Sequence, residues 1–203
     1  ANELLYAATL TNDKARQEAI YKKTTELYPN DFRAYNNLGM MAYANGDFTT
    51  AENYFKQAAS KDANAPEVNT NLGYIELVKG NVANAETYLS KSTGANTANE
   101  ALGNLYIKQG QYDRAVQAFG DTKTNSAALA QILAKDYNKA KNTLNAVKNP
   151  DAYTDYLMAI VGARTNNADL VKTSMAKVAQ KDATLAAKAQ IDREFAKYAN
   201  EIK

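Results

Sequence analysis

Apolar residues recur at spacings of three and four along much of the chain, which is the period of one helix face. One such stripe between residues 35 and 42 consists of Tyr35, Leu38, Met41 and Ala42. A second, near the C-terminus and spaced by four, three and four, consists of Ile191, Phe195, Tyr198 and Ile202. We therefore expect an all-α protein in which residues 184–202 form one last helix, as is typical of a capping helix.

The chain also repeats itself. Leu38-Gly39 recurs 34 residues later as Leu72-Gly73 and another 30 residues later as Leu102-Gly103. The same two shifts relate four further groups: Gly46, Gly80 and Gly110; Phe48, Val82 and Tyr112; Ala51, Ala85 and Ala115; and Phe55, Leu89 and Phe119. Independent positions that align under one pair of shifts indicate an internal structural repeat.

Each position of the repeat has a role in a pair of antiparallel helices. Glycine inside a helix costs about 1 kcal/mol relative to alanine, so Gly39 and its copies indicate close approach of a second helix. Gly46 and its copies are expected to end the first helix, because the residue after the last turn is often left-handed. Asp47 and Asn81 follow as predicted N-caps of the second helix.

The copies resemble the tetratricopeptide repeat family, whose pattern includes Leu-Gly and Ala-x-x-x-Phe. The first copy reads Tyr35-Asn-Asn-Leu38-Gly39, Gly46-Asp-Phe48 and Ala51-Glu-Asn-Tyr-Phe55. The third reads Leu102-Gly103-Asn-Leu-Tyr106, Gly110-Gln-Tyr112 and Ala115-Val-Gln-Ala-Phe119. The chain departs from the family pattern at three positions: Asn69 and Asn99 stand where the family has its first aromatic residue, and Ala63 stands where the family has proline. The resemblance implies a right-handed α-solenoid of antiparallel helix pairs.

The resemblance is clear over residues 32–122 and weaker outside them. A shift back by 34 puts Leu4 and Tyr21 in phase with Leu38 and Phe55, but Gln17 breaks the alanine phase. A shift of 25 continues the pattern through Tyr137, Ala140 and Leu144, with Lys135-Asp136 replacing the glycine turn. We expect one domain over residues 1–203 with about five repeats: degenerate 1–31, clear 32–65, 66–95 and 96–122, degenerate 123–150 and 151–182, and a capping helix at 183–203.

Composition narrows the chemistry. The chain has no Cys, no His and no Trp, so the usual structural zinc sites and catalysis by a cysteine nucleophile or a histidine base have no residues to use. The 24 basic and 22 acidic residues are interspersed, which argues against a nucleic-acid surface. No apolar stretch is long enough to span a membrane. We expect no cofactor, no metal and no catalysis, and we interpret Glu67 and Glu76 as acids on solvated helix faces.

In the family, the first helices of successive repeats line a concave groove. The resemblance places these candidate partner-binding residues there: Arg33, Asn36, Met40, Tyr43, Thr70, Tyr74, Leu77, Glu100, Asn104 and Lys108. The mixture of apolar, amide and charged groups suits an extended peptide or a partner helix. The alternative for each residue is that it faces solvent without binding, or is buried under a neighbouring repeat.

Chaperone-binding members of the family hold a C-terminal carboxylate with Lys and Asn on the first repeat and with Lys and Arg on the third. The matching positions here carry Asn36, Met40, Thr97 and Ala101. Without that clamp, a role as a chaperone co-factor is disfavoured.

The leading hypothesis is therefore a scaffold that binds a protein or peptide partner, as a module of a bacterial cell-envelope protein. The chain starts at Ala1 and lacks Cys, which fits a processed extracytoplasmic protein, periplasmic or outer-membrane-associated, although a cytoplasmic protein or a fragment stays open. One alternative is a glycan-binding lipoprotein of a sugar-uptake system, disfavoured by the absence of Trp and of long insertions. The other is a helical-toroid enzyme, disfavoured by the missing His and Cys. The oligomeric state is left open.

Overall fold

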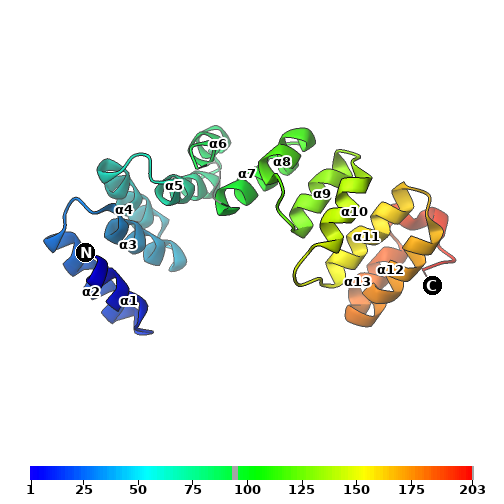
Figure 1. Ribbon diagram of the computed structural model, residues 1–203, viewed down its shortest axis with the longest axis horizontal. Coiled ribbons are helices and arrows are strands. Elements are labelled where there is room, and N and C mark those ends of the chain that lie inside the picture. Colours follow the sequence, from blue (N-terminus) through cyan, green and yellow to red (C-terminus); the bar gives the residue numbers. More distant parts are fainter. Residues whose placement is uncertain (93–95, 203) are drawn as a thin grey trace. The chain divides into compact units, whose positions relative to one another are not determined.

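The computed structural model describes residues 1–92 and 96–202, and every regular element within these ranges is a helix (Figure 1). The α-helices of the described residues are α1 (Asn2–Thr9), α2 (Lys14–Leu27), α3 (Phe32–Ala44), α4 (Phe48–Lys61), α5 (Pro66–Val78), α6 (Val82–Ser90), α7 (Asn96–Lys108), α8 (Tyr112–Phe119), α9 (Asn125–Leu133), α10 (Tyr137–Asn145), α11 (Ala152–Arg164), α12 (Ala168–Lys181) and α13 (Ala183–Gln190). A 3₁₀ helix, η1 (Arg193–Tyr198), follows α13. The expected all-α fold is confirmed.

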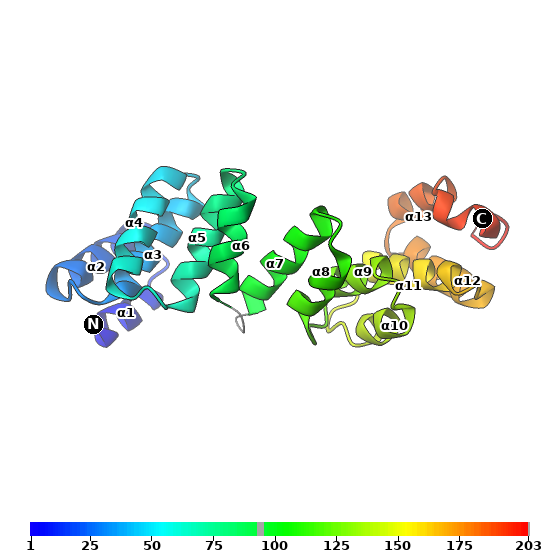
Figure 2. The ribbon, with the colours of Figure 1, turned by 90° about the horizontal axis from the view of Figure 1, so that it is seen from above.

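The chain forms two compact units, residues 1–101 (unit 1) and residues 102–203 (unit 2). Within unit 1, α3 packs on α4 and α5 packs on α6; within unit 2, α9 packs on α10 and α11 packs on α12 (Figure 2). These are the helix pairs that the repeat predicts. The single domain and the repeat boundaries stay predictions. None of the described helices combines the length and apolar character needed to cross a membrane.

The glycines inside the first helices allow the second helices to approach closely. A Cβ atom on Gly39 would lie 2.5 Å from the Phe55 ring, and one on Gly73 would lie 2.7 Å from Leu89. Such distances are well inside van der Waals contact, so any larger residue would displace the side chain opposite it. The predicted reason for glycine at this phase is confirmed.

The turns between paired helices use left-handed residues. Gly46, Gly80 and Gly110 have φ angles of +79°, +78° and +73°. The turn that the sequence places at Lys135 is also left-handed, with φ of +65°, although a lysine occupies it. Left-handed backbone brings Cβ close to the carbonyl oxygen, so this repeat keeps the geometry without the residue best suited to it.

The two predicted N-caps behave differently. Asp47 accepts a hydrogen bond from the backbone N–H of Thr50 at 3.0 Å and caps α4 as expected. Asn81 stands before α6, but its side chain makes no capping bond. Asn81 is thus the N-cap residue by position, as predicted, but its side chain donates to Glu76 at 3.0 Å instead of capping the helix. A nearby carboxylate is the stronger acceptor and attracts the amide away from the helix end.

The prediction of one continuous helix over residues 184–202 is also wrong. Helix α13 ends at Gln190, and Asp192 is extended, with its carboxylate accepting the Glu194 backbone N–H at 2.9 Å. An aspartate that bonds a nearby backbone N–H starts a new turn and competes with helix continuation. The break leaves Ile191 85% exposed and outside the stripe that was expected to contain it.

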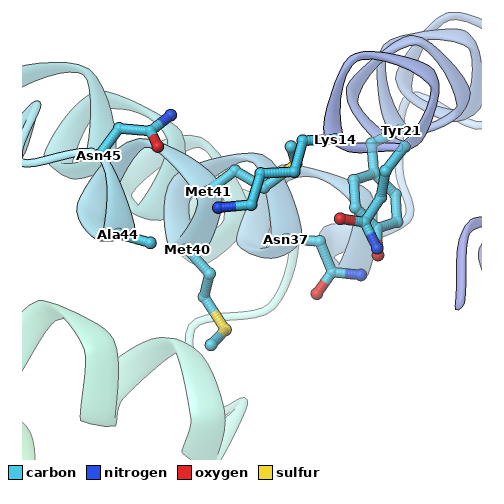
Figure 3. Close-up of a pocket in the computed structure, with 8 residues that line it drawn as sticks. Lys14, Tyr21, Asn37, Met40, Met41, Ala44 and Asn45 are labelled. Carbon is cyan, nitrogen blue, oxygen red and sulfur yellow. The ribbon is translucent and has the colours of Figure 1, made fainter. Parts of the chain in front are cut away.

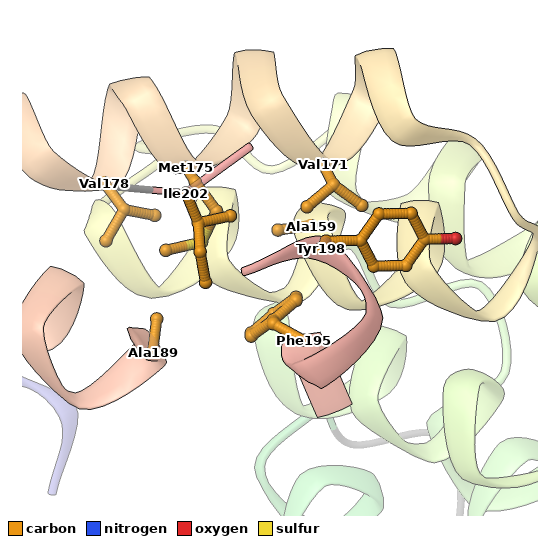
Figure 4. Packing of buried hydrophobic residues seen from close by; sticks show 8 residues of the cluster. All are labelled: Ala159, Val171, Met175, Val178, Ala189, Phe195, Tyr198 and Ile202. Carbon is orange, nitrogen blue, oxygen red and sulfur yellow. The ribbon is translucent and has the colours of Figure 1, made fainter. Parts of the chain in front are cut away.

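The remaining stripe residues form the core of the C-terminal cap. Phe195, Tyr198 and Ile202 are buried, and they pack against side chains of α11, α12 and α13 (Figure 4). The other buried members of this cluster are Ala159, Val171, Met175, Val178 and Ala189. The segment therefore closes the apolar end of unit 2, which is the role expected of a cap.

Candidate functional site

In unit 1, the first helix of each repeat is α1, α3 or α5. The large apolar side chains that are exposed along these helices fall at two equivalent positions of the repeat. Met40 of α3 is 51% exposed and Val78 of α5 is 46% exposed, and each occupies a groove position of its repeat. Tyr6 of α1 and Leu10, the C-cap residue of α1, are 65% and 69% exposed and lie 34 residues before Met40 and Ala44. Equivalent positions of stacked repeats point to the same side of a solenoid. We call Tyr6, Leu10, Met40 and Val78 the apolar set.

The candidate partner-binding residues did not include Tyr6, Leu10 or Val78, although the family pattern marks Val78 as a groove position. Tyr6 and Leu10 could have been found, because the same shift of 34 already aligns Leu4 with Leu38. Val78 stands at the groove position of α5 that corresponds to Ala44 of α3.

Two candidate groove residues are buried between helices. Asn36 accepts a hydrogen bond from the side-chain amide of Asn71 at 2.8 Å, joining α3 to α5. Thr70 donates its hydroxyl to the carbonyl oxygen of Pro66 at 2.8 Å. Asn36 therefore links α3 to α5, while Thr70 bonds within its own helix, and both have the buried place that the sequence left as the alternative.

Two candidate tyrosines and a leucine are half-buried. The Tyr43 ring meets Phe48 edge to face, with 5.2 Å between centroids. The Tyr74 hydroxyl donates to the backbone carbonyl of Thr97 at 3.3 Å. Burial, together with the charge of Glu100, raises the pKa of Tyr74 above its ordinary range. Leu77 of α5 is half-buried as well.

The charged and polar candidates are divided between the two units. Arg33 is exposed and its guanidinium pairs with Asp31 at 2.6 Å. Glu100 is half-buried in unit 1. Asn104 and Lys108 are exposed residues of unit 2. Unit 1 therefore contains eight of the ten sequence candidates, of which Arg33 and Met40 are exposed.

A cleft of about 280 Å³ lies between α2 and α3 beside the apolar set (Figure 3). Its lining residues come from both helices and include Met40, a member of that set. They are Lys14, Gln17, Tyr21, Asn37, Met40, Met41, Ala44 and Asn45. Figure 3 shows the side chain of Lys14 extending from α2 across the cleft toward α3.

Glu76, interpreted from sequence as a solvated acid, is buried. Burial alone would raise the pKa of its carboxyl group, but hydrogen bonds from Lys79, Asn81 and Asn84 outweigh this and hold the pKa below its ordinary value. A carboxylate held charged and bonded on several sides is suited to fixing the α5–α6 turn. Glu67 is exposed, as expected.

Three models of the tetratricopeptide repeat match the chain, over residues 20–53, 41–100 and 100–123. Together they run from residue 20 to residue 123 without a gap. The chain belongs to the tetratricopeptide repeat (TPR) family. The matches extend the TPR assignment upstream of the first clear repeat, into α2.

Solved structures with the same fold cover nearly all of the chain. PilF of Pseudomonas aeruginosa is 12% identical, with a TM-score of 0.74 over 98% of this chain and 95% of that chain. PilW, a type IV pilus biogenesis factor, is 19% identical, with a TM-score of 0.66 over 97% and 96%. YrrB, a TPR protein with an unusual peptide-binding site, is 17% identical, with a TM-score of 0.64 over 83% and 97%. At these identities the likeness shows the fold alone. No match to the chain was found among curated protein sequences.

Proposed function

We propose that this TPR protein is a non-catalytic scaffold and that the groove side of unit 1 binds a segment of a protein partner. The observation that carries the proposal is the apolar set. Single exposed apolar residues are ordinary on protein surfaces, but exposed apolar residues gathered on one side mark interaction sites. Tyr6, Leu10, Met40 and Val78 recur at two phases of three successive first helices, which gathers them on one side.

The helices beneath this surface are well held. The Asn71–Asn36 hydrogen bond links α5 to α3, and the Tyr74 hydroxyl links α5 to the backbone at Thr97. A surface fixed in this way loses little conformational entropy when a partner binds. Methionine and tyrosine adapt to varied apolar side chains, which suits an amphipathic helix or an extended peptide. Since the apolar set contains no Trp or Arg, we expect modest affinity.

The proposal can be tested by selecting binders from a displayed library of random 12-residue peptides. The full chain is compared with the double variant Met40→Glu and Val78→Glu. Both side chains are exposed, so we expect helicity and melting temperature to change little. Peptides enriched on the wild-type protein should fail to bind the double variant. The matched control is Ile191→Glu, which adds a charge at an exposed apolar residue of unit 2 and should bind normally. Equal binding by the double variant and wild type would contradict the groove assignment.

We further propose that the scaffold is a module of a bacterial cell-envelope protein. The supports are the absence of Cys and the fold shared with PilW, a type IV pilus biogenesis factor. Fractionation of cells that carry an epitope-tagged natural gene should place the protein in the periplasm or outer membrane. Recovery only in the cytosol would contradict this localisation without affecting the binding proposal.

A further inference from the structure

The cleft between α2 and α3 opens where the first repeat departs from the repeat pattern. The first residue of the second helix is Phe48 in α4, Val82 in α6 and Tyr112 in α8, whereas α2 begins with Lys14. One turn later, Gln17 replaces the alanine of the other repeats. Phe48 packs on the ring of Tyr43, whereas the residues 34 positions earlier are Lys14 and Thr9, so the first repeat lacks this aromatic pair. Lys14 and Gln17, which stand where the other repeats have packing residues, thus both line the cleft.

The cleft combines one unpaired cation with polar and apolar walls. Lys14 makes no ion pair with any described residue, although it is the one charged side chain among those lining the cleft. Its neighbour Asp13 is engaged in capping α2, where its carboxylate accepts the N–H groups of Ala15 and Arg16. Gln17 is fixed by donating to the carbonyl oxygen of Ala8 at 3.0 Å. Met40 and Met41 supply the apolar wall.

These features favour an acidic side chain as the occupant. A cationic group would be repelled by Lys14, and a purely apolar group would bury the amide groups of the cleft without hydrogen bonds. The methylene groups of Asp or Glu can contact the methionines while the carboxylate reaches the ammonium group. A chain terminus fits less well, because the apolar set continues onto α1 at Tyr6 and Leu10, so a segment covering the set passes the cleft and continues.

We propose that the cleft receives an Asp or Glu side chain of the bound partner segment, with the carboxylate paired to Lys14. This inference rests on the proposed function and names the partner as a segment in which an acidic residue lies among apolar ones. Pairs that are partly exposed contribute up to about 1 kcal/mol, so removing the charge should weaken binding about three- to tenfold.

The test uses the peptides selected from the random library on the full-length wild-type protein. They should be enriched in Asp or Glu at a fixed distance from their apolar residues. Lys14→Gln should weaken their binding about three- to tenfold, and so should Glu→Gln or Asp→Asn in the peptide, while both changes together should be no worse than either alone. Arg16→Gln is the matched control: it removes the same charge two residues along α2, outside the cleft, and should leave binding unchanged.

Two further arms sharpen the test. Lys14→Phe restores an aromatic residue at the phase of Phe48, and should close the cleft and abolish the preference for acidic peptides without lowering the melting temperature. Amidation of the peptide C-terminus should have no effect. A loss of binding on amidation would assign the cleft to a terminal carboxylate and overturn the proposal.

The outcomes separate this inference from the function on which it rests. Peptides that need Met40 and Val78 but neither an acidic residue nor Lys14 would overturn the cleft assignment and leave the groove proposal standing. A library that yields no peptide dependent on Met40 and Val78 would overturn both.

Discussion

Helices α3 and α11 have the same length and lie 120 residues apart, yet their groove positions meet different surroundings. Met40 of α3 is left open in unit 1. In unit 2, Tyr156, Ile160 and Arg164 occupy the positions of Asn36, Met40 and Ala44. The C-terminal cap bonds Tyr156 and Arg164, and Ile160 packs against the core cluster that the cap helps to form. The position in the repeat sets the direction in which a side chain points. Whether that side chain is exposed to solvent depends on the segments that pack over it, such as the C-terminal cap over α11.

The contacts of the cap on α11 are specific. The Tyr156 hydroxyl donates to the carboxylate of Asp192, and its ring meets Phe195 edge to face at 5.5 Å between centroids. The Arg164 guanidinium donates to both carboxylate oxygens of Glu194, with Nη2 at 2.7 Å from Oε2. An aromatic residue beside acidic residues therefore fits groove positions of this chain, which agrees with the acidic, apolar partner segment proposed for unit 1.

The largest expected effect concerns the cap. Phe195→Ala should destabilise unit 2 by about 3–5 kcal/mol, because a fully buried aromatic ring leaves a cavity. Ile191→Ala is the control: the side chain is exposed, so the change should stay within about 0.5 kcal/mol. Chemical denaturation with hydrogen exchange should show protection lost in α11 and α12 and retained in α3 and α4. Equal costs for the two substitutions would show that the apolar stripe is one helix face after all.

The second prediction introduces into unit 1 the pair of core residues that unit 2 has at the equivalent positions. Gly39→Ala should cost about 1–3 kcal/mol, because the new Cβ meets the Phe55 ring. At the equivalent positions of unit 2 stand Ala159 and Met175. Adding Phe55→Met should therefore recover part of the loss, with a coupling of about 0.5–3 kcal/mol in a double-mutant cycle. Strictly additive unfolding free energies would indicate that the two positions do not interact.

The third prediction concerns Tyr156 and pH. Burial and the hydrogen bond to Asp192 raise the pKa of Tyr156 well above its ordinary value of 10.0. The neutral phenol therefore contributes stability below about pH 10, and this contribution is lost as pH rises further, when the unfolded chain ionises more readily. Tyr156→Phe should cost about 1–3 kcal/mol at neutral pH and remove this alkaline loss. If the free energy of unfolding measured by urea denaturation fell above about pH 10 as much in Tyr156→Phe as in the wild type, the assignment would be contradicted.

The smallest effect concerns the turns. Unit 1 has glycine at its left-handed turns, whereas unit 2 has glycine at Gly110 but Lys135 at φ of +65° and Asn166 at φ of +54° in its later turns. Lys135→Gly should stabilise unit 2 by about 1 kcal/mol by relieving the close contact of Cβ. Asn166→Gly should gain less, since asparagine tolerates this conformation. A lower melting temperature for Lys135→Gly would show that the lysine side chain makes a compensating contribution.

The fold could be predicted because each repeat phase has a local physical cause. The tight contact at Gly39 and the left-handed turns at Gly46 and Lys135 follow from the sequence alone. The break in the helix at Asp192 could not be predicted from the sequence, because the spacing of Phe195 and Tyr198 also fits a continuous helix. It depends on the Asp192 carboxylate accepting the Glu194 backbone N–H and the Tyr156 hydroxyl, a residue 36 positions away.

The candidate site could be predicted only in part. The family pattern indicates which residues lie at groove positions, but Asn36 is buried where it accepts a hydrogen bond from the Asn71 side chain, and Tyr43 is half-buried by packing on Phe48. Both contacts depend on side chains of other helices. Gln17 was visible as a break in the repeat, but its connection with a cleft required the position of Lys14 relative to α3.

The most direct test uses the four methionines as probes, since Met40 and Met41 lie in unit 1 and Met158 and Met175 lie in unit 2. Methyl NMR spectra of ¹³C-methionine-labelled protein are recorded while a library-selected peptide is added. We expect the Met40 and Met41 signals to shift with saturation, while those of Met158 and Met175 stay in place. Shifts confined to Met158 and Met175, or saturable binding with no methionine shift, would contradict the claim that unit 1 carries the partner site.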